Sequence, residues 1–223
     1  GKIVLGVSPD YPPYEFTTTE NGQKKVVGAD IYLAQEIAKK LGVEVEIQEM
    51  AFDSLIAAVN ANKVDMVISG VNPTEERKKA VDFSDIYYTG KGIFVVNKDS
   101  AEIKSVADLK GKKVAFVDPS SASGYVYPGA MLKDAGIDLN KDIKYQFSGG
   151  HDKSIQLLLN KDVDAIASYE NVIKKYTKEF PTLKEDVRGL AKSELIPGVT
   201  VVVSNNVDDQ LKSSTRTHSR PDH

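Results

Sequence analysis

Short apolar runs alternate with amphipathic stretches along most of this chain, and that alternation limits the fold more than any other feature. Residues 2–8 and 43–48 have the pattern of strands, while residues 30–41 between them repeat apolar side chains at helical spacing. A second helical stretch at 52–61 leads to an apolar strand at 64–69. Strands and helices in strict succession are typical of a parallel sheet that is covered on both faces. The sequence therefore predicts an α/β fold.

The same alternation starts again in the second half of the chain. Strands are predicted at 113–117, 143–147 and 163–168, and helices at 125–135 and 152–159. The two halves also match each other without gaps at an offset of 99 residues, so that Phe52 aligns with His151. The identical pairs are Asp53/Asp152, Ile56/Ile155, Val64/Val163, Asp65/Asp164, Ser69/Ser168 and Asn72/Asn171. We infer two similar Rossmann-like lobes with parallel-core sheets, whose ligand loops face a shared cleft.

The lobes are expected to be joined by a two-strand hinge near residues 88–96 and 198–203. Residues 1–88 plus 203–213 would form the first lobe, and residues 89–202 the second. Residues 208–213 are the only stretch that could start a closing helix. Residues 214–223, STRTHSRPDH, have no apolar periodicity and resemble a non-native, vector-derived tail. A first lobe without closing helices would expose apolar surface, so self-association is one expectation.

Composition excludes several classes of protein. Lysine and arginine number 29 against 32 acidic residues, a formal charge of -3, which does not favour nucleic-acid binding. The chain has no cysteine and only three histidines, of which His218 and His223 fall in the tail, so neither a metal site nor a cofactor is expected. No apolar run reaches the length of a membrane-spanning helix. No signal peptide precedes the first strand, so the chain would be cytosolic or a mature, trimmed protein.

The turn from Ser69 to Lys79 is the first candidate for a binding site. Asn72 could cap a helix, with Pro73 at its first position and Glu75 completing a capping box. Backbone N–H groups at such a turn, together with the guanidinium of Arg77, would bind a small carboxylate. The alternative is a surface arginine on a capped helix.

A second candidate is the loop that follows the first strand. Tyr11, Tyr14 and Phe16 crowd around the adjacent prolines Pro12 and Pro13, which prevent regular structure there. These rings could line a pocket, or the loop could simply pack on its own side chains.

The first half resembles a known family, the polar amino-acid-binding periplasmic proteins, which are two-lobed, type II solute receptors of ABC importers. The motifs that carry the resemblance are Pro13-Tyr14-Glu15-Phe16, Val27-Gly28-Ala29-Asp30, Ser69-Gly70, Glu76-Arg77-Lys78-Lys79 and Phe83-Ser84, and it covers about residues 1–97. The resemblance implies that Arg77 binds an α-carboxylate, helped by amides near Asn72 and Thr74. It implies that the Gly70 carbonyl and the Asn72 side chain hold the α-ammonium, and that Tyr11 and Phe52 sandwich the ligand. Asn72 replaces the threonine or serine that is commonest at its position.

The second half, from about residue 110 to residue 204, looks more like the phosphonate-binding receptors of the same fold. Its motifs are Asp118-Pro119-Ser120-Ser121-Ala122-Ser123-Gly124-Tyr125 and Phe147-Ser148-Gly149-Gly150-His151-Asp152. The resemblance implies that Ser121, Ser123, His151 and Glu170 bind the ligand, while Ala122 replaces a usual threonine. Each has a structural alternative: the serines could cap the next helix, and His151 could cap the helix at 152–159. A carboxylate at the position of Glu170 needs a charged partner, because it follows a buried strand.

The leading hypothesis is therefore a non-enzymatic receptor that closes two lobes on a zwitterion, most simply an amino acid. Arg77 would take the carboxylate, Glu170 the ammonium, and Tyr11, Tyr14 and Phe52 would shape the side-chain pocket. The alternatives are an aminoalkylphosphonate receptor, an engineered chimeric scaffold that binds nothing, and a periplasmic dehydratase-like enzyme with Glu170 as acid near His151. A natural receptor would partner an ABC permease. It would be periplasmic or extracellular, with a membrane-anchored lipoprotein as one form of the full-length precursor.

Overall fold

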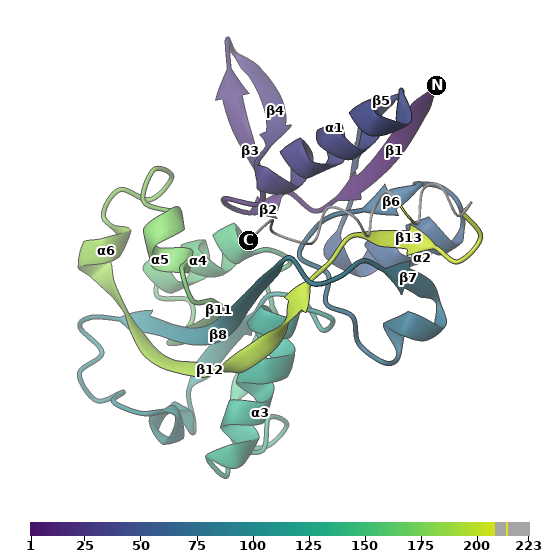
Figure 1. Cartoon of the computed structure of the whole chain (residues 1–223). Helices are drawn as coiled ribbons and strands as arrows, with labels where there is room; N and C mark the ends of the chain where they lie inside the picture. Colours follow the sequence, from purple (N-terminus) through teal and green to yellow (C-terminus); the bar gives the residue numbers. More distant parts are fainter. Residues whose placement is uncertain (208–212, 214–223) are drawn as a thin grey trace, which may run out of the picture. The chain divides into compact units, whose positions relative to one another are not determined.

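The computed structural model describes residues 1–207 and residue 213, and it divides into two units (Figure 1). Unit 1 comprises Gly1–Thr89 together with the chain from Pro197 onward, and unit 2 comprises Gly90–Ile196. The chain returns to unit 1 earlier than the expected boundary at 202/203, because the backbone of Val199 already bonds to that of Tyr87. The helix expected to start within 208–213 and the expected tail at 214–223 lie outside the described residues, apart from residue 213.

Unit 1 is built around a five-stranded mixed sheet with the strand order β5-β1-β6-β13-β7. Its elements are β1 (Lys2–Val7), β2 (Asp10–Tyr11), β3 (Glu15–Glu20), β4 (Gln23–Val27), α1 (Ala29–Leu41), β5 (Glu44–Glu49), η1 (Phe52–Ser54), α2 (Leu55–Asn60), β6 (Met66–Val67), η2 (Arg77–Lys79), β7 (Val81–Phe83) and β13 (Val202–Ser204). β1 runs parallel to both β5 and β6, while β13 is antiparallel to β6 and β7. The parallel centre confirms the predicted fold class.

Helix α1 forms because its apolar side chains recur on one face, and that face is buried. Ile31, Ala34 and Ile37 are at most 4% exposed and pack with Leu5 of β1 in one core cluster. Burying a side chain of this size stabilises the fold by about 1.5–3 kcal/mol. Gly42 ends the helix in the left-handed conformation, with φ at 68°, as its sequence position predicts.

The hairpin of β3 and β4 turns at Asn21-Gly22, a sequence typical of two-residue hairpin loops, and it projects from unit 1 beside α1 (Figure 1). Both turn residues have positive φ, 52° for Asn21 and 77° for Gly22. That combination matches the twist of antiparallel strands that are joined by two residues. The turn therefore sets the register of β3, and with it the position of Glu15 at the strand's beginning.

Unit 2 contains a second five-stranded mixed sheet, with the order β10-β9-β11-β8-β12. Its elements are β8 (Tyr88–Asn97), η3 (Val106–Leu109), β9 (Lys113–Phe116), η4 (Ala122–Val126), α3 (Tyr127–Asp134), β10 (Lys144–Phe147), α4 (His151–Leu159), β11 (Ala165–Tyr169), α5 (Val172–Lys175), α6 (Leu183–Asp186) and β12 (Val187–Val199). β9 is parallel to β10 and β11, and β8 is antiparallel to β11. Phe94, Phe116 and Leu132 are fully buried in the core of this unit.

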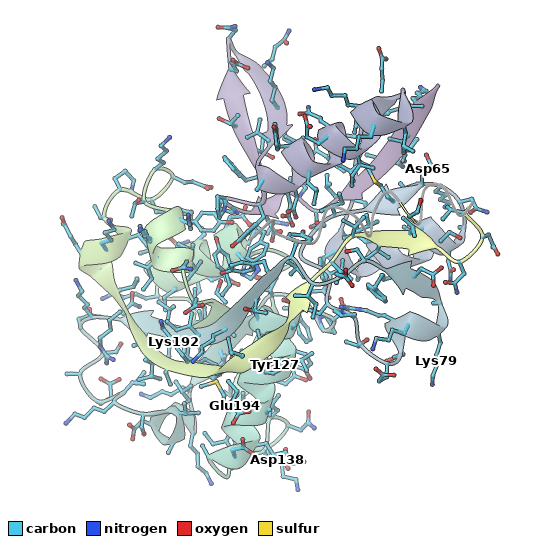
Figure 2. The ribbon with its side chains drawn as sticks, in the orientation of Figure 1. Asp65, Lys79, Tyr127, Asp138, Lys192 and Glu194 are labelled. Carbon is cyan, nitrogen blue, oxygen red and sulfur yellow. The ribbon has the colours of Figure 1, made fainter. Side chains whose placement is uncertain are left out.

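The repeat found in the sequence corresponds to a repeated structural bond. In unit 1, Asp65 accepts a hydrogen bond from the backbone N–H of Val4 at 2.7 Å and donates its own backbone N–H to the Val4 carbonyl at 2.8 Å. In unit 2, Asp164 makes the same pair of bonds to Lys113, each at 2.8 Å. Figure 2 shows Asp65 beside the start of β6. Each aspartate thus joins the approach to one strand, β6 or β11, to its parallel neighbour.

Candidate functional site

The segment that follows β6 does not form the helix that its cap signals predict. Among the described residues of this turn, the only helical element is the three-residue 3-10 turn η2, whose N-cap position is Glu76 and not Asn72. The hydroxyl oxygen of Thr74 accepts a hydrogen bond from the Arg77 N–H at 3.2 Å, the kind of bond that a capping side chain makes. The buried Val81 begins β7 so soon afterwards that a longer helix has no room. Strand pairing therefore overrides the local helix signals.

Arg77 nevertheless reaches back over the turn, as its position in the sequence predicts. Its Nη1 donates to the backbone carbonyl of Asn72 at 3.2 Å, and its guanidinium carbon lies 5.8 Å from the centre of the Phe52 ring. Asn72 is only 7% exposed, whereas Thr74 is exposed. A guanidinium carries five N–H donors in a fixed planar fork, and in Arg77 the Asn72 carbonyl and the Phe52 ring hold that fork in place. The structure thus brings Phe52, Asn72, Thr74 and Arg77 together.

The aromatic loop lies beside the same turn. The rings of Tyr11 and Tyr14 are 5.1 Å apart, and Tyr14 also packs on Tyr88 at 4.7 Å. Gly70 has φ at 65°, and a Cβ atom there would lie 3.2 Å from the Tyr11 ring. A larger residue at position 70 would therefore press on Tyr11. Of the predicted site residues in unit 1, Tyr11, Tyr14 and Gly70 form a second group.

Ser69 is hydrogen-bonded to Glu15, one of two buried acids, Glu15 and Asp30, that were not selected as site residues from the sequence. Its hydroxyl oxygen accepts from the Ser8 N–H at 2.9 Å and donates to Glu15 Oε1 at 3.0 Å. Glu15 and Asp30 are each 1% exposed, and burial raises the pKa of both carboxyl groups. Both acids lie inside the family motifs. They could have been selected from the sequence only by arguing that an acid at the start of a strand, and one at the start of a helix, would be buried.

In unit 2, the serine-rich turn is a capped π-helical turn. Ser121 is 7% exposed, and its hydroxyl oxygen accepts from the Gly124 N–H at 3.0 Å, so the capping alternative is confirmed for this residue. The hydroxyl proton of Ser121 is not used in that bond. Ser123 is partly exposed in the same turn, and Ala122 between them carries no hydroxyl group. The structure therefore brings Ser121 and Ser123 together on η4.

His151 is buried rather than displayed. Its Nδ1 lies 2.7 Å from Ser168 Oγ, its ring packs edge-on against Tyr169, and it begins α4 without acting as the cap. Burial lowers the pKa of His151 to about 3, so the ring is neutral at pH 7. A serine close to a histidine is also the arrangement of a nucleophile and its base, but Ser168 is 0% exposed and no substrate could reach it.

Glu170 follows β11 and has the charged partner that its position requires. Lys192 on β12, which Figure 2 labels, places its Nζ 3.2 Å from Glu170 Oε2. The side chain of Glu170 is 24% exposed, so the carboxylate is reachable from solvent. Within unit 2, the ammonium group of Lys192 therefore makes the ion pair with Glu170 that the sequence analysis expects from a ligand ammonium.

The described residues contain no group of histidines and acids that could hold a metal ion, and no helix long and apolar enough to cross a membrane. What unit 1 offers is a fixed guanidinium, aromatic rings and buried polar groups. What unit 2 offers is hydroxyl groups, a neutral imidazole and a carboxylate paired with lysine. Within each unit, groups of these kinds can bind a small polar molecule by hydrogen bonds and charge.

Comparison with known proteins gives two related results. Residues 24–217 match the family described as "ABC transporter, phosphonate, periplasmic substrate-binding protein". Over 195 residues the chain is 37% identical to the arginine-binding extracellular protein ArtP of Bacillus subtilis (strain 168), which covers 86% of this chain and 71% of ArtP. It is 31% identical to ABC transporter arginine-binding protein 1 of Escherichia coli (strain K12), which covers 82% of this chain and 69% of that protein. A probable histidine-binding protein of Campylobacter jejuni is 31% identical, and the chain spans 65% of it, just under two thirds.

Solved structures agree with the curated relatives. The substrate-binding protein of an amino acid ABC transporter superposes with a TM-score of 0.80 at 37% identity, covering 96% of this chain and 90% of that one. An ancestral arginine-binding protein bound to arginine gives a TM-score of 0.79 at 37% identity, covering 96% of this chain and 89% of that one. The fold and the sequence both relate the chain to binding proteins.

Proposed function

We propose that this chain, which belongs to the periplasmic substrate-binding proteins of ABC transporters, binds a basic amino acid and delivers it to a permease. It is an amino-acid-binding receptor, as its relatives for arginine, histidine and cystine are. Our proposal concerns the finer question of which amino acid it binds. We propose an amino acid with a basic side chain, of which L-arginine is the first candidate.

The observation that carries this proposal is the placement of Arg77 against the Asn72 carbonyl and the Phe52 ring. A planar guanidinium forms two parallel hydrogen bonds to a carboxylate, so Arg77 suits the carboxylate that all amino acids share. The basic side chain is supported by the arginine-binding relatives.

We further propose that residues of both units contact one bound ligand, with Glu170 exchanging part of its interaction with Lys192 for the ligand ammonium. Tyr11, Tyr14, Ser69, Gly70 and Thr74 would complete the contacts from unit 1. Ser121, Ser123 and His151 would contribute from unit 2. Burial of the charges in the bound state would strengthen each pairing.

An aminoalkylphosphonate is the second candidate, favoured by the phosphonate description of the matching family. The turn at Ser121 weakens it. The hydroxyl oxygen of Ser121 is already used by the Gly124 N–H, and Ala122 supplies no hydroxyl group. A phosphonate would then find fewer donors than an anion of its charge requires.

The partner that we propose is the permease of an amino-acid importer, and the location is outside the cytoplasmic membrane. ArtP is named an extracellular protein, and the matching family is described as periplasmic. We propose no catalysis, because the relatives are named as binding proteins and the Ser168–His151 pair is buried. The ArtP alignment covers 86% of the chain, so it includes residues of both units, which favours a single receptor over a chimera.

The test is isothermal titration calorimetry of the purified chain against the common amino acids and a set of aminoalkylphosphonates. We expect L-arginine to bind, and Arg77→Met to weaken it roughly 10- to 100-fold, the usual effect of losing a charged hydrogen bond. Lys79→Met is the matched control, because Lys79 is an exposed cation on the same turn, and it should leave the affinity unchanged. Silence across both panels would favour the non-binding scaffold and overturn the proposal.

A further inference from the structure

The buried carboxyl groups of Glu15 and Asp30 form a cluster that the proposed ligand contacts do not use. Glu15 begins β3, and Asp30 lies in the first turn of α1. Two backbone hydrogen bonds bring these elements together, from Ala29 N–H to the Pro13 carbonyl at 3.0 Å and from Asp30 N–H to the Tyr14 carbonyl at 2.8 Å. The two acids are therefore fixed beside each other by the main chain.

Each carboxyl group has one oxygen with a donor and one oxygen without. Ser69 Oγ donates to Glu15 Oε1 at 3.0 Å, and the Tyr87 hydroxyl donates to Asp30 Oδ1 at 2.9 Å. Glu15 Oε2 and Asp30 Oδ2 are buried and receive no hydrogen bond from any described group when both acids are ionised. The two carboxyl groups lie within hydrogen-bonding reach of each other. A single proton between them would satisfy both oxygens at once.

Among the groups that the structure describes around the pair, no positive charge offers another solution. The titratable groups around the pair are Asp10 and Tyr11 of β2, Tyr14 of the following loop, and Tyr87 and Tyr88 before and at the start of β8. All of them are acids or phenols, and no described salt bridge involves Glu15 or Asp30. Two adjacent buried carboxylates without a cation cannot both be ionised at low cost.

We propose that Glu15 and Asp30 share one proton, carried mainly by Glu15, and that the protonated pair positions Ser69 for ligand binding. The charge stays on Asp30, because the N-terminal end of α1 favours a negative group. The hydrogen bonds then run without interruption from Ser8 N–H through Ser69 and Glu15 to Asp30, which also accepts from Tyr87. Glu15 acts through Ser69 and is a positioning residue; this second half of the inference rests on the proposed function.

The shared proton has a sign that can be measured. Burial and the charge of Asp30 raise the pKa of Glu15 well above its ordinary value of 4.5. Above pH 4.5 the unfolded chain therefore releases a proton that the folded chain keeps, and rising pH favours unfolding until the folded pair also loses it. Glu15→Gln mimics the protonated acid, because its amide can donate to Asp30 while its carbonyl accepts from Ser69.

The experiment compares urea unfolding of the full chain and of Glu15→Gln from pH 5 to pH 8. We expect the ratio of their unfolding equilibrium constants to change with pH, by at most about tenfold per pH unit, with the wild-type chain becoming less stable relative to Glu15→Gln as pH rises. Glu20→Gln, at the exposed end of the same strand, is the matched control and should follow the wild-type slope. Parallel slopes for wild type and Glu15→Gln would overturn the shared proton.

A measurement on the wild-type protein tests the shared proton even if Glu15→Gln does not fold, and calorimetry tests the positioning role. Infrared spectroscopy of wild-type protein labelled with carbon-13 glutamate should show a protonated carboxyl band at pH 7, and its absence would overturn the proposal. In calorimetry with L-arginine, Glu15→Ala should bind about tenfold more weakly, while Glu15→Gln restores the affinity. Equal loss in both variants would overturn the positioning role. Failure of the wild-type chain to bind any amino acid would overturn the proposed function, while the unfolding slopes would still decide the shared proton.

Discussion

His151 illustrates how burial decides what a titratable side chain can do. The sequence places it among ligand-binding residues by resemblance, and the structure gives it Ser168 as a hydrogen-bond partner and Tyr169 as a packing partner. With its pKa lowered to about 3, the ring carries no charge at neutral pH. If it contacts a ligand, it does so as a neutral hydrogen-bonding group and not as a cation that attracts an anion.

This burial predicts acid sensitivity that depends on one residue. The unfolded histidine takes up a proton near pH 6.5 while the folded one does not, so the free energy of unfolding should fall as pH drops below 6.5, by up to about 1.4 kcal/mol per pH unit. His151→Gln should lack this slope. Chemical denaturation of both proteins between pH 4 and 8 measures the free energy of unfolding. The two values are subtracted at each pH, because Glu15 changes the stability of both proteins in the opposite direction. Identical profiles would contradict the neutral, buried imidazole.

At the scale of elements, the join between the β3–β4 hairpin and α1 depends on one glycine. Gly28 has φ at 131° and ψ at 177°, a backbone conformation that residues other than glycine essentially never adopt. A Cβ atom at this position would lie 2.2 Å from the Tyr14 carbonyl oxygen. The close approach is what allows the Ala29 and Asp30 amides to bond the loop before β3.

Gly28→Ala should therefore destabilise the protein by more than about 3 kcal/mol, through backbone strain and steric overlap together. Gly22→Ala is the matched control, because Gly22 also has positive φ, at 77°, but nothing lies within 4 Å of a Cβ atom there. It should cost only about 1–2 kcal/mol. Denaturant midpoints of the two variants compare them, and equal losses would show that strain alone, and not the Tyr14 contact, matters.

The elements that sequence patterns predicted well are those whose signals are local. The periodicity of α1, its terminal Gly42 and the Asn21-Gly22 turn each specify their structure within a few residues. β12 was missed, because Val187–Val199 contains two glycines and a proline and is held as a strand by β8. The helix expected after Asn72 was wrong for the same reason, since pairing partners distant in the sequence determine where β7 begins.

For the candidate site, the sequence indicated which residues lie near one another within unit 1. Arg77, Phe52, Asn72 and Thr74 were named from the sequence, and in the structure Arg77 contacts the Phe52 ring, the Asn72 carbonyl and the Thr74 hydroxyl group. Glu15 was not named, because its role depends on being 1% exposed, which no spacing rule reveals. Whether the named residues of both units bind one ligand stays a prediction.

At the scale of the whole molecule, the proposed ligand contacts predict that binding slows amide exchange in both units. Hydrogen–deuterium exchange with saturating L-arginine should slow the amides of residues 69–79 in unit 1 and of residues 119–126 and 169–171 in unit 2, because bound segments open less often. Arg77→Met at the same ligand concentration is the control and should show much weaker protection. Slowing confined to unit 1 would contradict a ligand shared by the two units.

The matched bonds of Asp65 and Asp164 carry a consequence for how such chains evolve. Each aspartate bonds a neighbouring strand of its own unit, and neither pair of bonds spans the boundaries between the units after Thr89 and Ile196. Recombination between related genes at those boundaries would leave both pairs of bonds intact, whichever parents supplied the halves. An exchange of one half between relatives would therefore not be opposed by the loss of either pair of bonds.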